Sequence, residues 1–127
     1  MTRRSASCGM LVMVLVLGVL AEGAPAQDKA EGKKYYTTYC SSCHGESGKG
    51  DGAAAVSLPV KPADHTDGTV MNQIPDKVLF EIISKGGQAA GKSSFMPGWG
   101  SQLKEKQIRD IVAYLRSIAN PPYKPGK

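Results

Sequence analysis

The chain has 127 residues, including 15 Gly and 8 Pro, and carries a formal net charge of +5 at pH 7. This length is close to that of one domain and contains no internal repeat, which excludes repeat, coiled-coil and multidomain architectures. Three cysteines are too few for a disulfide-rich scaffold, and the modest positive charge, without a basic and aromatic stripe, gives no support to nucleic-acid binding.

Residues 1–26 are expected to be a secretory signal peptide rather than part of the fold. Two arginines near the start precede an apolar run over 10–20, and 24–26 reads Ala-Pro-Ala, the small-x-small pattern of a cleavage site. The run is shorter than the about 20 residues that a membrane span needs, although an anchor that is kept is the alternative. We therefore expect one domain over 27–127, located in the periplasm.

A first helix is expected from near Asp28, a good N-cap residue, and Glu31 follows three positions later in the pattern of a capping box. Small, aromatic and cysteine residues then recur at helical spacing: Gly32, Tyr35, Tyr36, Tyr39, Cys40 and Cys43. One face of this helix therefore runs directly into the two cysteines that remain after the signal.

The segment 45–73 is expected to be a long irregular loop, because glycines and prolines punctuate it, with one short helical turn over 53–57. A loop of this length inside a small domain needs a physical reason. The apolar supply of the domain is also thin, and a small core usually needs a staple or a cofactor. A loop that wraps a bulky cofactor accounts for both observations.

A second helix is predicted over about 75–85, with Asp76 at the positive end of its dipole and Gly86 as its C-terminal cap. After a further loop, a third helix is predicted over about 103–119, where apolar residues recur most regularly and Pro121 ends the pattern. No segment alternates like a strand, so the predicted fold class is all-α.

Cys40-Ser41-Ser42-Cys43-His44 has the spacing C-x-x-C-H, which is the attachment signature of c-type haem. Residues at i, i+3 and i+4 share one side of a helical turn. Both thiols can then form thioethers with the two vinyl groups of one porphyrin, and the histidine points at the iron. The pattern predicts one haem c, covalently bound through Cys40 and Cys43, with His44 as an iron ligand.

Three other interpretations of the two cysteines are weaker. A thioredoxin-like C-x-x-C requires a βαβ context, of which the pattern shows nothing. A structural zinc site needs four Cys or His ligands, and the one further histidine, His65, is distant in sequence. A plain disulfide between Cys40 and Cys43 is the remaining alternative.

The second axial position of the iron has three candidate donors, Met71, Met96 and His65. A thioether sulfur is a suitable donor and raises the reduction potential of the iron. Met96 is the preferred choice because it lies in a loop bounded by Gly and Pro, where Pro97 makes the backbone rigid. Met71 fits core packing better, and His65 is expected to be solvated in a polar segment.

An ordered set of motifs resembles a class I (monohaem) cytochrome c over essentially all of 27–127: Gly32, Tyr36, Cys40-x-x-Cys43-His44-Gly45, Met96-Pro97 and Ile111-x-x-Tyr114-Leu115. The resemblance implies the cytochrome c fold, with three main helices plus long loops wrapped around one covalently attached haem c. It also implies that the first helix crosses the last, and that His44 and Met96 are the axial ligands.

One departure from the family concerns the group that orients the histidine ligand. In many members a proline shortly after the Gly-rich stretch offers its carbonyl to the other N–H of that histidine, whereas Ala53 and Ala54 stand at this place here. A carbonyl within 58–62 is expected to take this role. The cavity walls are expected to include Phe95, Trp99 and Tyr36.

With both axial positions of the iron filled, substrate chemistry is disfavoured and the transfer of one electron remains. We expect a monomeric periplasmic electron carrier, not an enzyme, between redox proteins with acidic docking surfaces. No stable membrane insertion is expected if the signal is cleaved. Lys49, Lys85 and Lys92 are candidates for the rim of the haem crevice. The alternatives are a haem-bearing subunit of a larger oxidoreductase complex and a ligand-binding or peroxidase-like haem enzyme.

Overall fold

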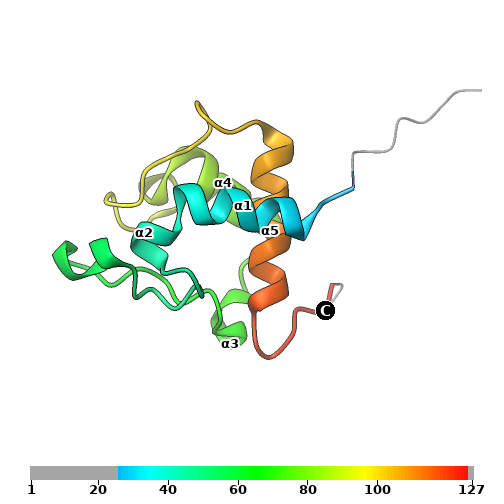
Figure 1. Cartoon of the computed structure of the whole chain (residues 1–127), viewed down its shortest axis with the longest axis horizontal. Helices are drawn as coiled ribbons and strands as arrows, with labels where there is room; N and C mark the ends of the chain where they lie inside the picture. Colours follow the sequence, from blue (N-terminus) through cyan, green and yellow to red (C-terminus); the bar gives the residue numbers. More distant parts are fainter. Residues whose placement is uncertain (1–25, 126–127) are drawn as a thin grey trace, which may run out of the picture.

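The computed structural model of the chain describes residues 26–125, so the predicted signal peptide lies outside the described residues except for its last position. Figure 1 shows helices joined by long loops, in the order α1 (Lys29–Tyr39), α2 (Ser41–His44), η1 (Ala53–Ser57), α3 (Gly68–Met71), α4 (Asp76–Lys85), η2 (Gly87–Ala90) and α5 (Glu105–Ile118). The β-structure of the described part is one isolated bridge between Asp67 and Asn120. The predicted all-α class, with α1, α4 and α5 as the three main helices, is confirmed.

The first and last main helices cross in the middle of the molecule (Figure 1). Gly32 lies at the crossing, where a methyl group on its Cα would overlap the Asp110 carbonyl and lie 2.9 Å from the amide nitrogen of Ile111. One turn further along α1, the rings of Tyr36 and Tyr114 are 5.1 Å apart. The crossing is therefore the one that the family resemblance implies.

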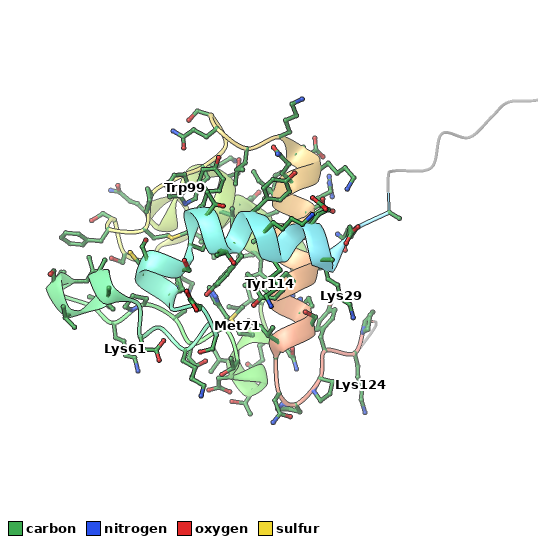
Figure 2. The ribbon with its side chains drawn as sticks, viewed as in Figure 1. Lys29, Lys61, Met71, Trp99, Tyr114 and Lys124 are labelled. Atoms are coloured by element: carbon green, nitrogen blue, oxygen red, sulfur yellow. The ribbon has the colours of Figure 1, made fainter. Side chains whose placement is uncertain are left out.

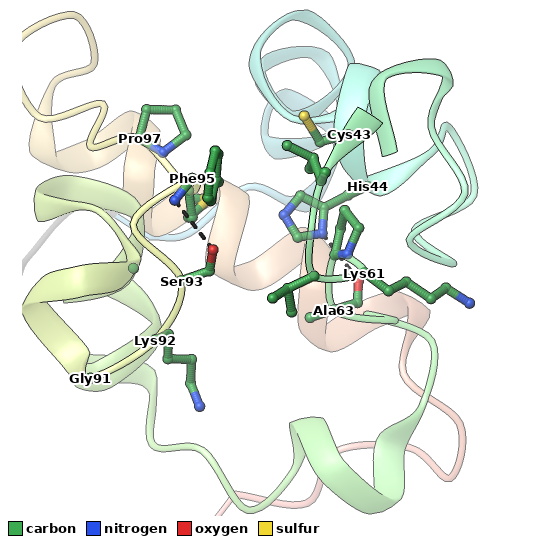
Figure 3. Close-up of a pocket in the computed structure, with 14 residues that line it drawn as sticks. Cys43, His44, Lys61, Ala63, Gly91, Lys92, Ser93, Phe95 and Pro97 are labelled. Carbon is green, nitrogen blue, oxygen red and sulfur yellow. Dashed lines mark hydrogen bonds between the residues drawn. The ribbon is translucent and has the colours of Figure 1, made fainter. Parts of the chain in front are cut away.

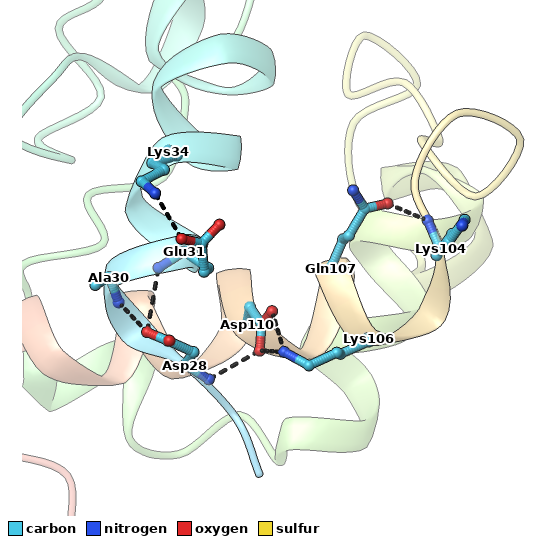
Figure 4. Close-up of polar contacts among 8 residues, drawn as sticks. All are labelled: Asp28, Ala30, Glu31, Lys34, Lys104, Lys106, Gln107 and Asp110. Carbon is cyan, nitrogen blue, oxygen red and sulfur yellow. Dashed lines mark hydrogen bonds and ion pairs between the residues drawn. The ribbon is translucent and has the colours of Figure 1, made fainter. Parts of the chain in front are cut away.

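The start of α1 is fixed by two aspartates (Figure 4). The Asp28 carboxylate accepts the N–H groups of Ala30 and Glu31, as predicted for an N-cap. The other hydrogen bond of the predicted capping box, from the Asp28 N–H to the Glu31 side chain, is not formed. Glu31 pairs with Lys34, and the Asp28 N–H donates to Asp110 Oδ1 at 2.8 Å. The cap thus ties the N-terminus of α1 directly to α5.

The core lies between α1, α4 and α5. Its buried side chains are Tyr36, Cys40, Met71, Leu79, Ile83, Leu103, Ile108, Ile111, Val112, Tyr114 and Leu115. Figure 2 shows Met71 and Tyr114 inside the fold, while Lys29, Lys61 and Lys124 project from its surface. α5 begins two residues later than predicted, with Lys104 as N-cap, and the Gln107 side chain accepts the Lys104 N–H.

The long loop holds more structure than its sequence predicts. The turn over 53–57 is confirmed as η1, but α3 was not expected, although the Asp67 carboxylate caps it in the usual way. Arg116 of α5 anchors this region, since its guanidinium donates to the carbonyls of Met71 and Ile74 and to the Asp76 carboxylate. The loop is therefore pinned to the helical core on one side of the molecule.

Candidate haem-binding site

A cavity of about 390 Å³ opens between α2 with the following loop on one side and the loop around Met96 on the other (Figure 3). Its volume is within the range of roughly 300 to 1,000 Å³ that is usual for ligand and cofactor pockets. The lining is mostly apolar: Cys43, His44, Leu58, Val60, Lys61, Pro62, Ala63, Gly87, Gly91, Lys92, Ser93, Phe95, Met96 and Pro97.

The helical turn α2 positions the C-x-x-C-H motif. The N–H groups of Cys43 and His44 both donate to the Cys40 carbonyl, at 3.2 and 2.9 Å, which is the turn that the spacing predicts. Cys43 and His44 line the cavity, whereas Cys40 lies beneath them in the core. Burial, followed by the nearby Cys43, raises the pKa of the Cys40 thiol to about 12. Both cysteines are free thiols, so the structure does not support the disulfide alternative.

His44 is oriented by the main chain of the loop. Its Nδ1–H donates to the Ala63 carbonyl at 3.1 Å, so the expectation of a carbonyl within 58–62 is wrong by one residue. Burial lowers the pKa of His44, against the opposing effect of this hydrogen bond. The ring is therefore neutral, and with Nδ1 occupied by the proton its Nε2 keeps the lone pair that a metal requires.

Met96 lies in the opposite wall, where Figure 3 shows the neighbouring Ser93, Phe95 and Pro97 facing His44 across the cavity. The Met96 carbonyl accepts the N–H of Gly87 at 3.0 Å. A methyl group on Gly87 would lie 3.1 Å from Met96 Cβ. A glycine at the start of η2 therefore lets the methionine loop lie close against the end of α4.

The other two candidate donors do not face Met96 across the cavity. Met71 is 2% exposed and belongs to the core, as its sequence context suggested. His65 is a correction, because its ring is not solvated but packs face to face on the His44 ring, 4.2 Å between centroids. Neither Met71 nor His65 lines the cavity, so Met96 is the candidate donor that shares it with His44.

The predicted walls are corrected in part. Phe95 lines the cavity and is 58% exposed at its mouth. Tyr36 lies behind the wall, where its hydroxyl donates to the Gly45 carbonyl, and Trp99 packs on Tyr39. Of the three lysines predicted at the rim, only Lys92 lines the cavity. Lys61 lines it as well. The sequence did not predict this, because Lys61 lies far from Lys92 along the chain.

The donor set fits a covalently attached haem. Two thiols one helical turn apart, a neutral imidazole, a thioether opposite it and an apolar lining are the groups that such a haem uses. A structural zinc site is not supported, since no cluster of three or more His, Cys, Asp or Glu side chains that could hold a metal ion occurs within 26–125. The residues present therefore match haem chemistry and not that of zinc.

Comparisons with known proteins agree with this site. A family model described as "Cytochrome c" matches residues 29–119. The chain is 29% identical over 108 residues to the "Cbb3-type cytochrome c oxidase subunit CcoP" of Azospirillum sp. (strain B510), covering 81% of this chain and 33% of that protein. It is 27% identical over 105 residues to cytochrome c6 of Synechococcus sp. (strain ATCC 27167 / PCC 6312), covering 83% of each.

A solved structure is also similar. It is a chain of the "Kuenenia stuttgartiensis reducing HAO-like protein complex Kustc0457/Kustc0458", with a TM-score of 0.59 and 28% sequence identity, covering 81% of this chain and 50% of that one. The chain thus spans about a third of the oxidase subunit and half of the complex subunit. None of the helices within 26–125 has the length and apolar character to cross a membrane.

Proposed function

Because the chain belongs to the cytochrome c family, we propose that it is a periplasmic one-electron carrier with a single haem attached through Cys40 and Cys43. In this proposal His44 and Met96 are the axial ligands of the iron. A bound haem supplies a metal centre that changes its oxidation state by one electron. The observation that carries the proposal is that His44 and Met96 line one apolar cavity, in which Phe95 and Pro97, the neighbours of Met96, face His44 (Figure 3).

The surrounding residues suit electron transfer better than substrate turnover. Two protein donors leave no open position at the iron for a substrate. The Ala63 carbonyl orients His44 through Nδ1, and the Gly87 N–H holds the Met96 main chain, so little rearrangement of either donor is expected on electron transfer. The apolar lining disfavours the more highly charged oxidised site and therefore raises the reduction potential.

A free carrier is favoured over a complex subunit by the extent of the match to cytochrome c6, which covers 83% of both chains. The second candidate, a subunit of a larger oxidoreductase, is favoured by the oxidase subunit and by the HAO-like complex, whose chains are longer than this one. Size-exclusion chromatography of a periplasmic extract separates the two. A carrier elutes near the mass of the single chain, and a subunit elutes with its complex.

The mouth of the cavity offers a docking surface for acidic partners. Val60 and Phe95 are 60% and 58% exposed there, and Lys61 and Lys92 also line the opening. Exposed apolar side chains flanked by ammonium groups suit a brief encounter with an acidic redox protein, with charge setting the rate of approach.

Met96→Ala tests the ligand assignment, with Met71→Ala as the matched control. Loss of the Met96 sulfur is expected to remove the weak long-wavelength absorption band of the oxidised protein, lower the reduction potential and permit binding of carbon monoxide by the reduced protein. Met71→Ala destabilises the core but keeps that band. An unchanged potential and spectrum in Met96→Ala would overturn the assignment, and carbon monoxide binding by the unaltered protein would favour the haem-enzyme alternative.

The periplasmic location is tested on the exported protein. The intact mass of the mature protein is expected to correspond to a chain that begins at Gln27 and carries one haem. A mass that retains residues 1–26 would support the membrane anchor, and a colourless product from cells with a working maturation system would overturn the proposed function.

A further inference from the structure

The ring of His65 lies flat against the ring of His44. The ring centroids are 4.2 Å apart and the planes are inclined by 20°. His65 also meets the Tyr36 ring edge to face, with 5.9 Å between the ring centroids. The His65 imidazole therefore contacts both a proposed iron ligand and a core tyrosine.

The backbone holds His65 firmly in this place. Its N–H donates to the Gly48 carbonyl at 2.6 Å. Gly48 has a φ of +86°, and a methyl group on it would lie 3.4 Å from His65 Cβ and 2.7 Å from Ile118 Cδ1. Since only glycine fits such a conformation and such a close approach, the two loop segments are held together around the imidazole.

Two contacts on His44 come from the same short segment. The Ala63 carbonyl accepts the His44 Nδ1–H and so fixes one point on the edge of the ring. One hydrogen bond still allows the ring to swing about the line through that bond. The face of His65, two residues further on, blocks this swing. Edge and face contacts together define the plane of the His44 ring.

Filling of space alone does not account for a flat ring at this position. The Nδ1 atom of His65 is buried, and no group within 26–125 forms a hydrogen bond with it. A buried polar atom without a partner is unfavourable, and an aliphatic side chain of similar volume would avoid it. A flat ring, in contrast, offers a surface that a branched aliphatic side chain does not.

We propose that His65 is a positioning residue, whose stacked ring sets the orientation of the His44 imidazole plane relative to the haem. This inference rests on the proposed function, because it requires His44 to be an iron ligand. Groups around a metal ligand orient it and tune the metal. The orientation of an axial imidazole plane determines the magnetic anisotropy of a low-spin ferric haem, so the effect is visible by magnetic resonance.

The test compares His65→Phe with His65→Leu in the holoprotein. His65→Phe keeps a flat ring, and His65→Leu fills similar space without one. We expect the electron paramagnetic resonance g-values and the spread of the haem methyl proton shifts to stay close to those of the unaltered protein in the phenylalanine variant, and to change in the leucine variant. If both variants match the unaltered protein, His65 only fills space and the proposal is overturned.

A measurement on the unaltered protein keeps the proposal testable if the leucine variant does not mature. In the diamagnetic reduced protein, nuclear Overhauser effects between the ring protons of His65 and His44 are expected, and their absence overturns the proposal. The spectrum of the oxidised protein separates this result from failure of the proposed function. If the sulfur band of Met96 is present and the Overhauser effects are missing, the ligand set stands and only the role of His65 is wrong.

Discussion

Gly32 of α1 and Asp110 of α5 meet main chain to main chain at the helix crossing. A methyl group on Gly32 would overlap the Asp110 carbonyl, so these two helices approach as closely as backbones allow. The Asp110 side chain, 2% exposed, also accepts the Asp28 N–H and pairs with Lys106 (Figure 4). The position of α2 and of the haem-binding motif depends on this crossing, because α2 directly follows α1.

Gly32→Ala is expected to destabilise the protein. The added methyl group would force the helices apart, and overpacking of this kind typically costs about 1–3 kcal/mol. Helix propensity alone would favour alanine by roughly 1 kcal/mol. A loss of stability in this variant therefore reports the close contact at the helix crossing. Urea denaturation followed by circular dichroism measures the effect. Lys33→Ala, an exposed substitution in the same helix, is the control, and equal stability of both variants would contradict the close contact.

Tyr36→Phe is expected to destabilise the fold next to His44, the proposed iron ligand. The Tyr36 hydroxyl donates to the Gly45 carbonyl at 2.9 Å in a buried position, and Gly45 follows His44. The Gly45 carbonyl still accepts the Gly48 N–H at 3.1 Å, so the variant loses one net hydrogen bond, which costs about 0.5–1.5 kcal/mol. Thermal denaturation with Tyr35→Phe as the control measures the loss. A melting temperature equal to that of the control would show that this hydrogen bond contributes nothing.

Stability is expected to fall as the pH falls below about 4. Hydrogen bonds lower the pKa of three carboxyls below the ordinary value of 3.8. Asp28 accepts the N–H groups of Glu31 and Ala30. Asp64 accepts the Thr66 hydroxyl, and Asp67 accepts the Thr69 hydroxyl. The unfolded chain therefore binds protons more readily than the folded protein. The stabilisation that these carboxylates provide is fully present above their unfolded pKa and is lost as the pH falls through their folded pKa.

Urea denaturation at pH 5 and pH 3 measures this loss in the holoprotein. The variant with Asn at all three positions keeps the acceptor oxygens but cannot be protonated, so its stability should depend less on pH over this range. Glu46→Gln, an exposed carboxyl, is the control. An unchanged pH dependence in the triple variant would exclude these carboxyls as the cause.

Cys40→Ala combined with Cys43→Ala is expected to abolish covalent haem attachment and to leave little folded protein. The buried core is small, and a domain of this size depends on a staple or a cofactor. Haem staining after denaturing electrophoresis and thermal denaturation measure the two effects. Ser42→Ala, within the same motif, should retain both haem and fold. A cooperative, native-like transition in the double variant would contradict the need for the haem.

Lys61→Glu combined with Lys92→Glu is expected to slow electron exchange with an anionic oxidant such as hexacyanoferrate(III). Both side chains line the cavity, and electrostatic steering changes association rates by about 10-fold or more at low salt. Lys29→Glu with Lys124→Glu alters the net charge equally on the side of the molecule away from Lys61 (Figure 2) and serves as the control. Stopped-flow rates that fall equally in both pairs would argue against a docking surface at the cavity.

The parts of the fold that sequence predicted are those that short-range physics controls. The helical periodicity of α5, the N-cap role of Asp28 and the cap at Gly86, with its φ of +91°, all depend on neighbours within a few residues. The spacing of Cys40, Cys43 and His44 is likewise a property of one helical turn. Each of these features was confirmed because the residues concerned interact mainly with their own element.

The amino-acid sequence by itself determined the chemistry of the site: two thiols, an imidazole and a thioether in an all-α chain. Only the tertiary structure decided which groups surround them. Ala63 rather than a carbonyl in 58–62 holds His44, His65 stacks on that ring instead of meeting solvent, and Lys61 joins Lys92 at the opening. These contacts join segments that lie far apart along the chain, and their partners are set by how the loops pack on the helix crossing, which no local pattern encodes.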